Sequence, residues 1–233
     1  MSLLDKLLSI ASNPIETSVP ALKPSGFEHF GELGQGLLRM LRQKNGFYAF
    51  ESALHVFPAS HFDGEMTLSR WNSHGLWRYE YGELAEGFLF FAEDIFGNQF
   101  CIRDGEIGIF DAETATVDRL ASSLEEWAAL ILGDYDLHTG YRVAHHWQKQ
   151  HGPLPIGKRL GLKMLLVFGG NYQMENLYAA EAVEAMRFRG HIANKIKDVP
   201  DGTTVLLQVV DDERSPETWA DTWTRKPNQS PSR

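Results

Sequence analysis

The sequence predicts an α+β protein, in which helices pack mainly on one side of an antiparallel meander sheet. Three observations indicate this class. Residues 88–121 alternate short apolar runs with tight turns, an amphipathic helix follows at once, and a C-terminal β-α-β extension is predicted within residues 153–210. A sheet with helices on one face is an arrangement in which such elements bury their apolar surfaces.

Four strands joined by turns form the predicted meander. Residues 88–92 are a continuous apolar run, typical of a strand buried on both faces. The following turn contains Asp94, Gly97 and Asn98, which we expect to have structural roles, because such residues favour turns. Asp104 and Gly105 then form the strongest short-range signal for a hairpin. One more turn leads to a last strand over residues 116–120.

The helix after the meander has clear start and stop signals. Ser122 with Glu125, and Ser123 with Glu126, both fit the reciprocal capping box. Gly133 is expected to end the helix by adopting a left-handed conformation. One apolar face is formed by Leu124, Trp127, Ala128 and Ile131.

These segments resemble the SUKH superfamily. The resemblance is carried by the run Phe91–Phe100, by Asp104-Gly105 with Ile109–Asp111, and by the serine-rich helix start with Trp127. The upstream stretches Asn45–Tyr48 and Ala53–Pro58, and Trp71-Asn72, also fit. The resemblance covers roughly residues 27–132. It implies a non-catalytic protein, because the superfamily includes a fungal regulator of cell-wall synthesis and many bacterial immunity proteins that neutralise toxins.

The remaining sequence predicts how the chain is organised. We expect four parts: an N-terminal helix and proline-rich linker (1–26), the SUKH-like domain (27–133), an extension packed on the same body (134–212) and a polar, disordered tail (213–233). Further elements are predicted as helices near residues 3–10, 28–43 and 140–150, strands at 76–81, 164–168 and 203–210, and either one kinked helix or two short ones around Gly190.

Composition limits the kinds of partner. The formal net charge is −9, which disfavours nucleic acid as the main ligand and fits a partner with a basic surface. Cys101 is the single cysteine, so no intrachain disulfide forms, and it lies in a predicted strand as a buried apolar side chain. The N-terminus shows no signal peptide, and no run approaches the ~20 apolar residues of a membrane helix. We therefore expect a cytoplasmic protein without membrane contact.

Three patterns that suggest catalytic chemistry have simpler explanations. The histidines 138, 145, 146 and 151 lack the spacing of a metal site, because His145 and His146 diverge by about 100° on a helix. The glycines at 31–36 and 169–170 lack the context of a phosphate-binding loop and are better explained as turns. Glu93 and Asp94 point to opposite faces of a strand, so they do not share a substrate. We predict no catalytic residue, metal or cofactor.

Together with the net acidity and the lack of a catalytic constellation, the resemblance to the SUKH superfamily implies an immunity protein. We expect it to bind and occlude a cognate toxin, from a polymorphic or type VI secretion system and encoded by a neighbouring gene. Its candidate partner-binding residues are Asp63, Glu65, Glu80, Glu83, Glu86 and Trp71; Trp71 fits the core equally well. Two alternatives stay open, a regulatory or scaffold module of the same fold and a metal-dependent hydrolase. The oligomeric state is also open.

Overall fold

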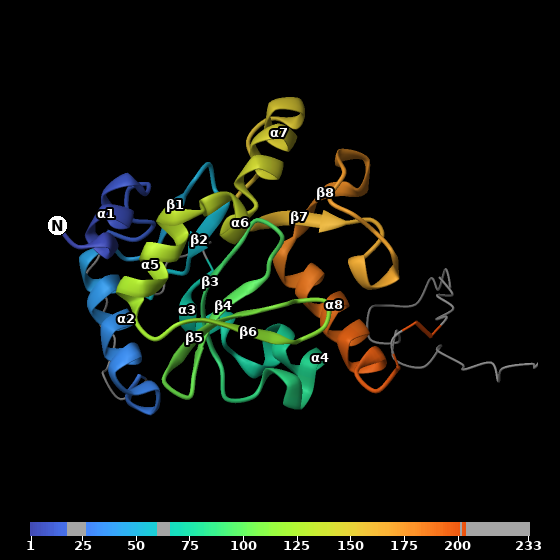
Figure 1. Cartoon of the computed structure of the whole chain (residues 1–233), viewed down its shortest axis with the longest axis horizontal. Helices are drawn as coiled ribbons and strands as arrows, with labels where there is room; N and C mark the ends of the chain where they lie inside the picture. The colour runs from blue at the N-terminus through green and yellow to red at the C-terminus, as the bar shows by residue number, and fades with distance from the viewer. Residues whose placement is uncertain (18–26, 60–65, 201, 204–233) are drawn as a thin grey trace, which may run out of the picture. The chain divides into compact units, whose positions relative to one another are not determined.

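The computed structural model describes residues 1–17, 27–59, 66–200 and 202–203 (Figure 1). The chain divides into two compact units, Met1–Asp198 and Val199–Arg233. The first unit runs across the predicted boundary at residue 133 without a break, whereas the boundary at 212 lies outside the described residues. In the second unit, Thr203 N donates to Pro200 O at 3.2 Å, within the turn predicted there.

A six-stranded antiparallel sheet lies at the centre of the first unit, with its strands in sequence order. The strands are β1 (Phe47–Ala49), β2 (Leu54–Val56), β3 (Leu89–Glu93), β4 (Gln99–Arg103), β5 (Glu106–Phe110) and β6 (Val117–Ala121). The last four are the predicted meander. The first two come from a stretch whose type the sequence left undecided. The α+β class is therefore confirmed.

The hairpin between β4 and β5 has the predicted two-residue turn. Arg103 pairs with Glu106, and between them Asp104 and Gly105 have φ angles of +52° and +78°. Two successive left-handed residues match the twist of the flanking strands, which is why Asp-Gly is favoured here. This turn fixes the register of the two strands.

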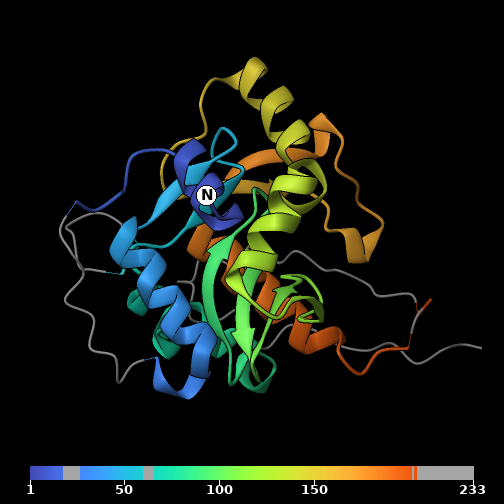
Figure 2. The same ribbon diagram turned by 60° about the vertical axis from the view of Figure 1, so that its left-hand side comes forward.

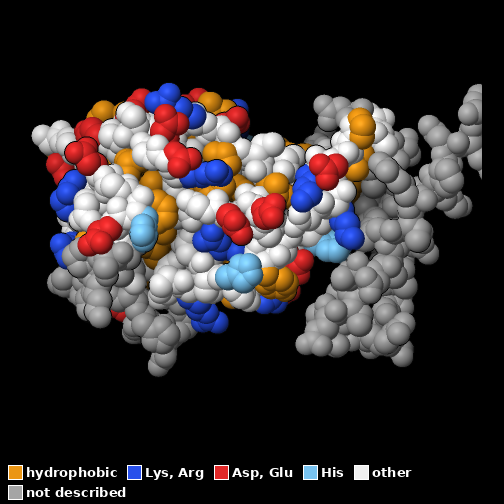
Figure 3. Space-filling model, turned by 90° about the horizontal axis from the view of Figure 1, so that it is seen from below, with side chains coloured by type: hydrophobic (Ala, Val, Ile, Leu, Met, Phe, Trp, Pro, Cys, Tyr) orange, Lys and Arg blue, Asp and Glu red, His pale blue; other side chains and the backbone are white. Residues whose placement is uncertain are grey.

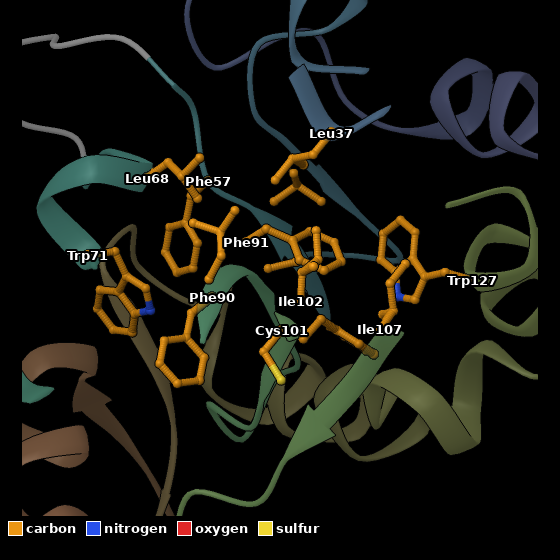
Figure 4. Packing of buried hydrophobic residues seen from close by; sticks show 14 of the residues in the cluster. Leu37, Phe57, Leu68, Trp71, Phe90, Phe91, Cys101, Ile102, Ile107 and Trp127 are labelled. Carbon is orange, nitrogen blue, oxygen red and sulfur yellow. The ribbon is translucent and has the colours of Figure 1, made fainter. Parts of the chain in front are cut away.

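Helices cover both faces of the sheet, not mainly one. On one face lie α2 (Gly31–Gln43) and α5 (Leu124–Gly133), with α1 (Leu3–Ile10) packed on α5. Trp127 of α5 packs edge-on against Phe100, with ring centroids 5.6 Å apart. The opposite face carries Trp77, whose ring lies 5.1 Å from that of Phe90. The elements on this face are α3 (Leu68–Trp71), η3 (His74–Arg78), α4 (Tyr79–Tyr81), η4 (Gly82–Ala85) and α8 (Ala182–Ile196). Figure 4 shows Phe90, Phe91 and Trp127 among the packed side chains of the core.

The prediction of a strand at residues 76–81 is wrong, because this segment is helical. Trp77, Tyr79 and Tyr81 alternate, as they would on a strand. However, Trp77 and Tyr81 are both fully buried, while Tyr79 is 44% exposed. Residues four apart share one face of a helix, so Trp77 and Tyr81 are buried together while Tyr79 faces the solvent.

The predicted caps of α5 are partly confirmed. Ser123 Oγ accepts a hydrogen bond from Glu126 N at 3.1 Å, and the Glu126 carboxylate accepts from the amide and hydroxyl of Ser122. Glu125 instead accepts from the amides of Leu3 and Leu4, at the N-terminus of α1. The prediction of a left-handed cap at Gly133 is wrong, since Gly133 is the last helical residue and Asp134 is the cap.

The residues after α5 form two helices, a separate small sheet and α8. They are α6 (Tyr135–Thr139), α7 (Tyr141–His151), β7 (Lys158–Leu162), η5 (Leu166–Phe168), η6 (Met174–Asn176) and β8 (Leu177–Glu181). Earlier in the chain, the short helix η2 (Glu28–Phe30) precedes α2. β7 and β8 pair with each other and not with the main sheet. The predicted strand at 164–168 is thus wrong, because the strand lies six residues earlier and Leu166–Phe168 form the short 3-10 helix η5. The strand predicted at 203–210 and the tail lie almost wholly outside the described residues.

A second apolar cluster joins this region to the main sheet. It combines Ile95 and Phe96 of the turn after β3 with Trp147 of α7 and Leu160 of β7. Leu160 N also donates to Ile95 O at 2.8 Å. None of the described helices is both long enough and apolar enough to cross a bilayer.

Helix α8 is continuous through Gly190. The glycine is needed there because the Tyr81 ring packs directly against the helix backbone. A Cβ at Gly190 would lie 2.5 Å from the Tyr81 ring. We expect Gly190→Ala to lower the free energy of unfolding by about 1–2 kcal/mol, since overpacking outweighs the ~1 kcal/mol helix preference of alanine. Gly133→Ala is the matched control, because no atom lies within 4 Å of its Cβ position. Equal denaturant midpoints for the two variants would contradict this packing.

Candidate functional site

A buried ionic junction lies at the end of β3. The Glu93 carboxylate accepts a hydrogen bond from Arg159 Nε at 2.7 Å and lies 2.9 Å from His55 Nδ1. Gln99 Nε2 donates to its other oxygen at 3.3 Å. The sheet register places His55 opposite Glu93, and β7 brings Arg159. All three ionisable residues are no more than 4% exposed, so this is an enclosed network.

The electrostatics of the junction fix its protonation states. Burial by itself would raise the pKa of Glu93, but Arg159 and then His55 outweigh it and hold that pKa at about 2. Burial lowers the pKa of His55 more than its bond to Glu93 raises it. The ring is therefore neutral and donates from Nδ1 to the carboxylate.

The rings of Tyr48 and Phe57 enclose His55, with centroids 4.4 and 4.6 Å away. This enclosure leaves no route for a substrate, so the junction is structural.

The neighbouring carboxylate, Asp94, organises a turn instead. Its oxygens accept hydrogen bonds from the amides of Phe96 and Asn98 and from the Asn98 side chain, at 2.8 to 2.9 Å. Gly97, with φ +84°, supplies the left-handed residue of this turn. Burial raises the pKa of Asp94 to about 6, although these bonds oppose the shift. Glu93 and Asp94 thus have separate roles, as their alternation along the strand predicted.

A small cavity lies beside this turn. Its volume of about 20 Å³ has room for roughly one water molecule. Arg189, which is 6% exposed, donates from Nη1 to Phe96 O at 2.6 Å, and its Nη2 has no hydrogen-bond partner among the described residues. The cavity is too small for an organic substrate. It is lined by Phe96, Asn98, Asp111, Glu113, Leu160, Leu162, Leu165, Leu166, Tyr172 and Arg189.

Comparisons with known proteins agree with this architecture. Residues 32–129 match the SMI1 / KNR4 family (SUKH-1). This region belongs to the SUKH superfamily. The crystal structure of Atu4351 from Agrobacterium tumefaciens is similar to the chain, with a TM-score of 0.56, 12% identity and coverage of 79% of this chain and 86% of that one. At this identity the likeness concerns the fold alone. No curated protein matches the sequence.

The junction joins the SUKH region to the residues that follow it. His55, Glu93 and Asp94 lie inside the matched range, whereas Arg159 and Arg189 lie beyond it. Glu113, also inside the range, accepts a hydrogen bond from Val167 N at 3.1 Å. The buried carboxylates of Glu93 and Glu113 thus bind the segment that follows the matched range.

The histidines of α6 and α7 do not converge. His145 Nδ1 lies 2.8 Å from Glu51, and His151 Nδ1 lies 2.9 Å from Trp147 O in its own helix. Within the part of the chain that the structure describes, no three His, Cys, Asp or Glu side chains are grouped so that they could hold a metal ion.

The structure describes four of the six predicted partner-binding residues. Trp71 is 1% exposed and donates to Gln99 at 2.7 Å, so it belongs to the core beside the SUKH sheet and presents no surface to a partner. Glu80 is half-buried, 3.8 Å from His191. Glu83 and Glu86 are exposed. Asp63 and Glu65 lie outside the described residues. The underside of the molecule, which carries α4, mixes acidic and basic side chains (Figure 3).

Sequence reasoning missed the residues of the junction other than Glu93. His55 and Arg159 lie 38 and 66 positions from Glu93 in the chain. The available signal was that His55 and Arg159 are ionisable residues within apolar segments of the sequence. Such a residue, if buried, needs an opposite charge, but the sequence does not say which one.

Proposed function

We propose that this chain is an immunity protein that binds a cognate toxin protein and blocks its active site or channel. The observation that carries the proposal is the match of residues 32–129 to the SUKH-1 family, a range that contains all six strands of the central sheet. The buried ionisable groups described above all have structural roles. This favours a protein that acts by binding another molecule. The lone, buried Cys101 is compatible with a reducing cytosol, where the proposal places the protein.

Co-expression tests this function directly. We expect the cognate toxin to be encoded by a neighbouring gene. That gene is expressed in a sensitive host, with and without this chain. We expect growth to be rescued and the two proteins to purify together. A toxin that binds but still kills, or no binding at all, contradicts the proposal. A stable complex with a host protein in place of the toxin would instead support the regulatory or scaffold alternative, which the same fold allows.

Acidic side chains are expected to speed the encounter with a basic toxin. We keep the exposed residues Glu83 and Glu86 as proposed contacts at the edge of the interface with the toxin. We expect Glu83→Lys combined with Glu86→Lys to lower the association rate by about tenfold at low salt, with a smaller difference at high salt.

The matched control is Glu28→Lys with Glu32→Lys, which makes the same charge change on η2 and α2, away from α4. Stopped-flow kinetics at two salt concentrations measure both variants. Equal association rates for the two double variants would show that the net charge of the protein determines the rate, and that the position of Glu83 and Glu86 does not.

A further inference from the structure

The loop between β1 and β2 has an unusual backbone. Phe50, Glu51 and Ser52 have successive φ angles of +52°, +52° and +69°. Each non-glycine residue in the left-handed region is unfavourable by about 1–2 kcal/mol, so three in a row need support from the surrounding structure. Strained backbone of this kind persists where neighbouring contacts hold it, often at sites that bind something.

Helix α7 provides that support. Tyr141 Oη donates to Glu51 Oε1 at 3.3 Å, and His145 Nδ1 lies 2.8 Å from Oε2. Gln148 Nε2 also donates to Glu51 O at 2.9 Å. These three residues recur at spacings of four and three, so they form one face of α7. From the main body, Arg159 Nη1 donates to Ser52 O at 3.3 Å.

The supported loop completes a row of aromatic rings on the surface. Phe50 stacks on Tyr135, Tyr135 contacts Tyr141, and Tyr141 contacts His145, with centroid separations of 4.9, 5.2 and 5.7 Å. Tyr135 is 40% exposed and Phe50, Tyr141 and His145 are partly exposed. Both views of the ribbon show α7 standing out from the rest of the described chain (Figures 1 and 2). We refer to Phe50, Tyr135, Tyr141 and His145 as the ring row.

The charges around the ring row are mainly negative. Glu51, whose side chain is 48% exposed, and Asp134 and Asp136 lie beside it, whereas Arg142 is already paired with Asp136 at 2.8 Å. The bond to His145, and to a smaller extent the charge of Lys149, lower the pKa of the Glu51 carboxylate. Exposed tyrosine rings with adjacent carboxylates form favourable contacts with guanidinium and ammonium groups.

We propose that the ring row is the docking surface for a partner protein's loop that carries an arginine or lysine beside an apolar side chain. The cation stacks on the Tyr135 ring and bonds to Glu51 or Asp134, and the apolar side chain packs along the neighbouring rings. Tyrosine is enriched among the residues that dominate binding energy, and a loop already held in place loses little entropy on binding. From the proposed function this inference takes only that the chain acts by binding another protein.

A random peptide library displayed on phage tests the surface without knowledge of the toxin. The full chain is the bait, and the selected peptides are measured against Tyr135→Ala, Tyr135→Phe and Phe188→Ala. We expect the peptides to contain Arg or Lys beside an apolar residue. Their affinity should fall at least about tenfold with Tyr135→Ala, recover with Tyr135→Phe and stay unchanged with Phe188→Ala, which removes a still more exposed ring on α8.

Three results would overturn the inference: no enriched peptide, enrichment without a cationic residue, or affinities that Tyr135→Ala leaves unchanged. Thermal melting of each variant verifies that it is folded. The co-expression test separates this inference from the proposed function. If the Tyr135→Ala variant still rescues growth, the ring row is not the docking surface, but the immunity function stands. If the unaltered chain fails to rescue growth, the immunity function is contradicted, but the peptide result still stands.

Discussion

Replacing Arg159 by methionine is expected to lower the free energy of unfolding by about 3–5 kcal/mol. Methionine occupies a similar volume but leaves the Glu93 carboxylate buried without its guanidinium partner. Glu93 and Arg159 have side chains that are 3% and 4% exposed, so water cannot replace the lost interaction. Unfolding in urea, followed by tryptophan fluorescence, measures the change.

Arg142→Met is the control for this prediction. Arg142 also forms an ion pair, with Asp136 at 2.8 Å, but its side chain is 75% exposed. Exposed ion pairs contribute about 0–1 kcal/mol, so this variant should change stability little. A double variant, Glu93→Gln with Arg159→Met, should be more stable than the sum of the single changes predicts, because it leaves no buried charge unpaired. Similar losses for Arg142→Met and Arg159→Met would contradict the interpretation of the junction.

The meander was predictable because its signals are local. Asp104-Gly105 specifies a two-residue turn. The apolar run at 88–92 is long enough for a buried strand and too short for a helix. The segment 76–81 was misassigned for a related reason. Aromatic residues at every second position satisfy a strand, yet the first and third also lie four apart and satisfy a helix. Only the packing of Trp77 and Tyr81 against the sheet decides between the two.

The candidate site was less predictable, because its contacts are remote in the chain. The separate roles of Glu93 and Asp94 followed from strand geometry alone. The role of Arg159 did not, since nothing near residue 159 indicates a partner 66 positions earlier. The ring row likewise combines a hairpin loop with two helices about 90 residues later. Trp71 was a candidate contact because tryptophan is frequent at interfaces, with a place in the core as an equal alternative. The structure places Trp71 in the core.

Stability is expected to fall steeply in acid, below about pH 4.5, and the junction is the reason. The folded-state pKa of Glu93 is about 2, below the ordinary 4.5. A carboxyl group with a lowered pKa contributes stability above its unfolded value and loses it as the pH falls toward its folded value. The shift corresponds to about 3 kcal/mol, lost between roughly pH 4.5 and 2.

Other buried groups modify this profile at higher pH. The lowered pKa of His55 means that the unfolded chain binds its proton more readily, so stability is lost as the pH falls through the ordinary histidine value of 6.5. Asp94 has the opposite sign. Its folded pKa of about 6 lies above the ordinary 3.8, so stability rises as the pH falls between these values. Below about pH 6 the two effects have opposite signs. Glu93 is therefore the main cause of the decline below its ordinary pKa of 4.5.

Comparison with Glu93→Gln isolates the contribution of the carboxylate. At pH 7 the unaltered chain should be the more stable, because only it has the charge that pairs with Arg159. As the pH falls toward 2, Glu93 becomes protonated and resembles glutamine, so the gap in unfolding free energy should close. Glu106→Gln, which removes a carboxylate from the exposed pair with Arg119, should show a small gap throughout. Urea unfolding at several pH values measures both gaps, and a Glu93→Gln gap that stayed constant down to pH 2 would mean that the charge of Glu93 does not stabilise the fold.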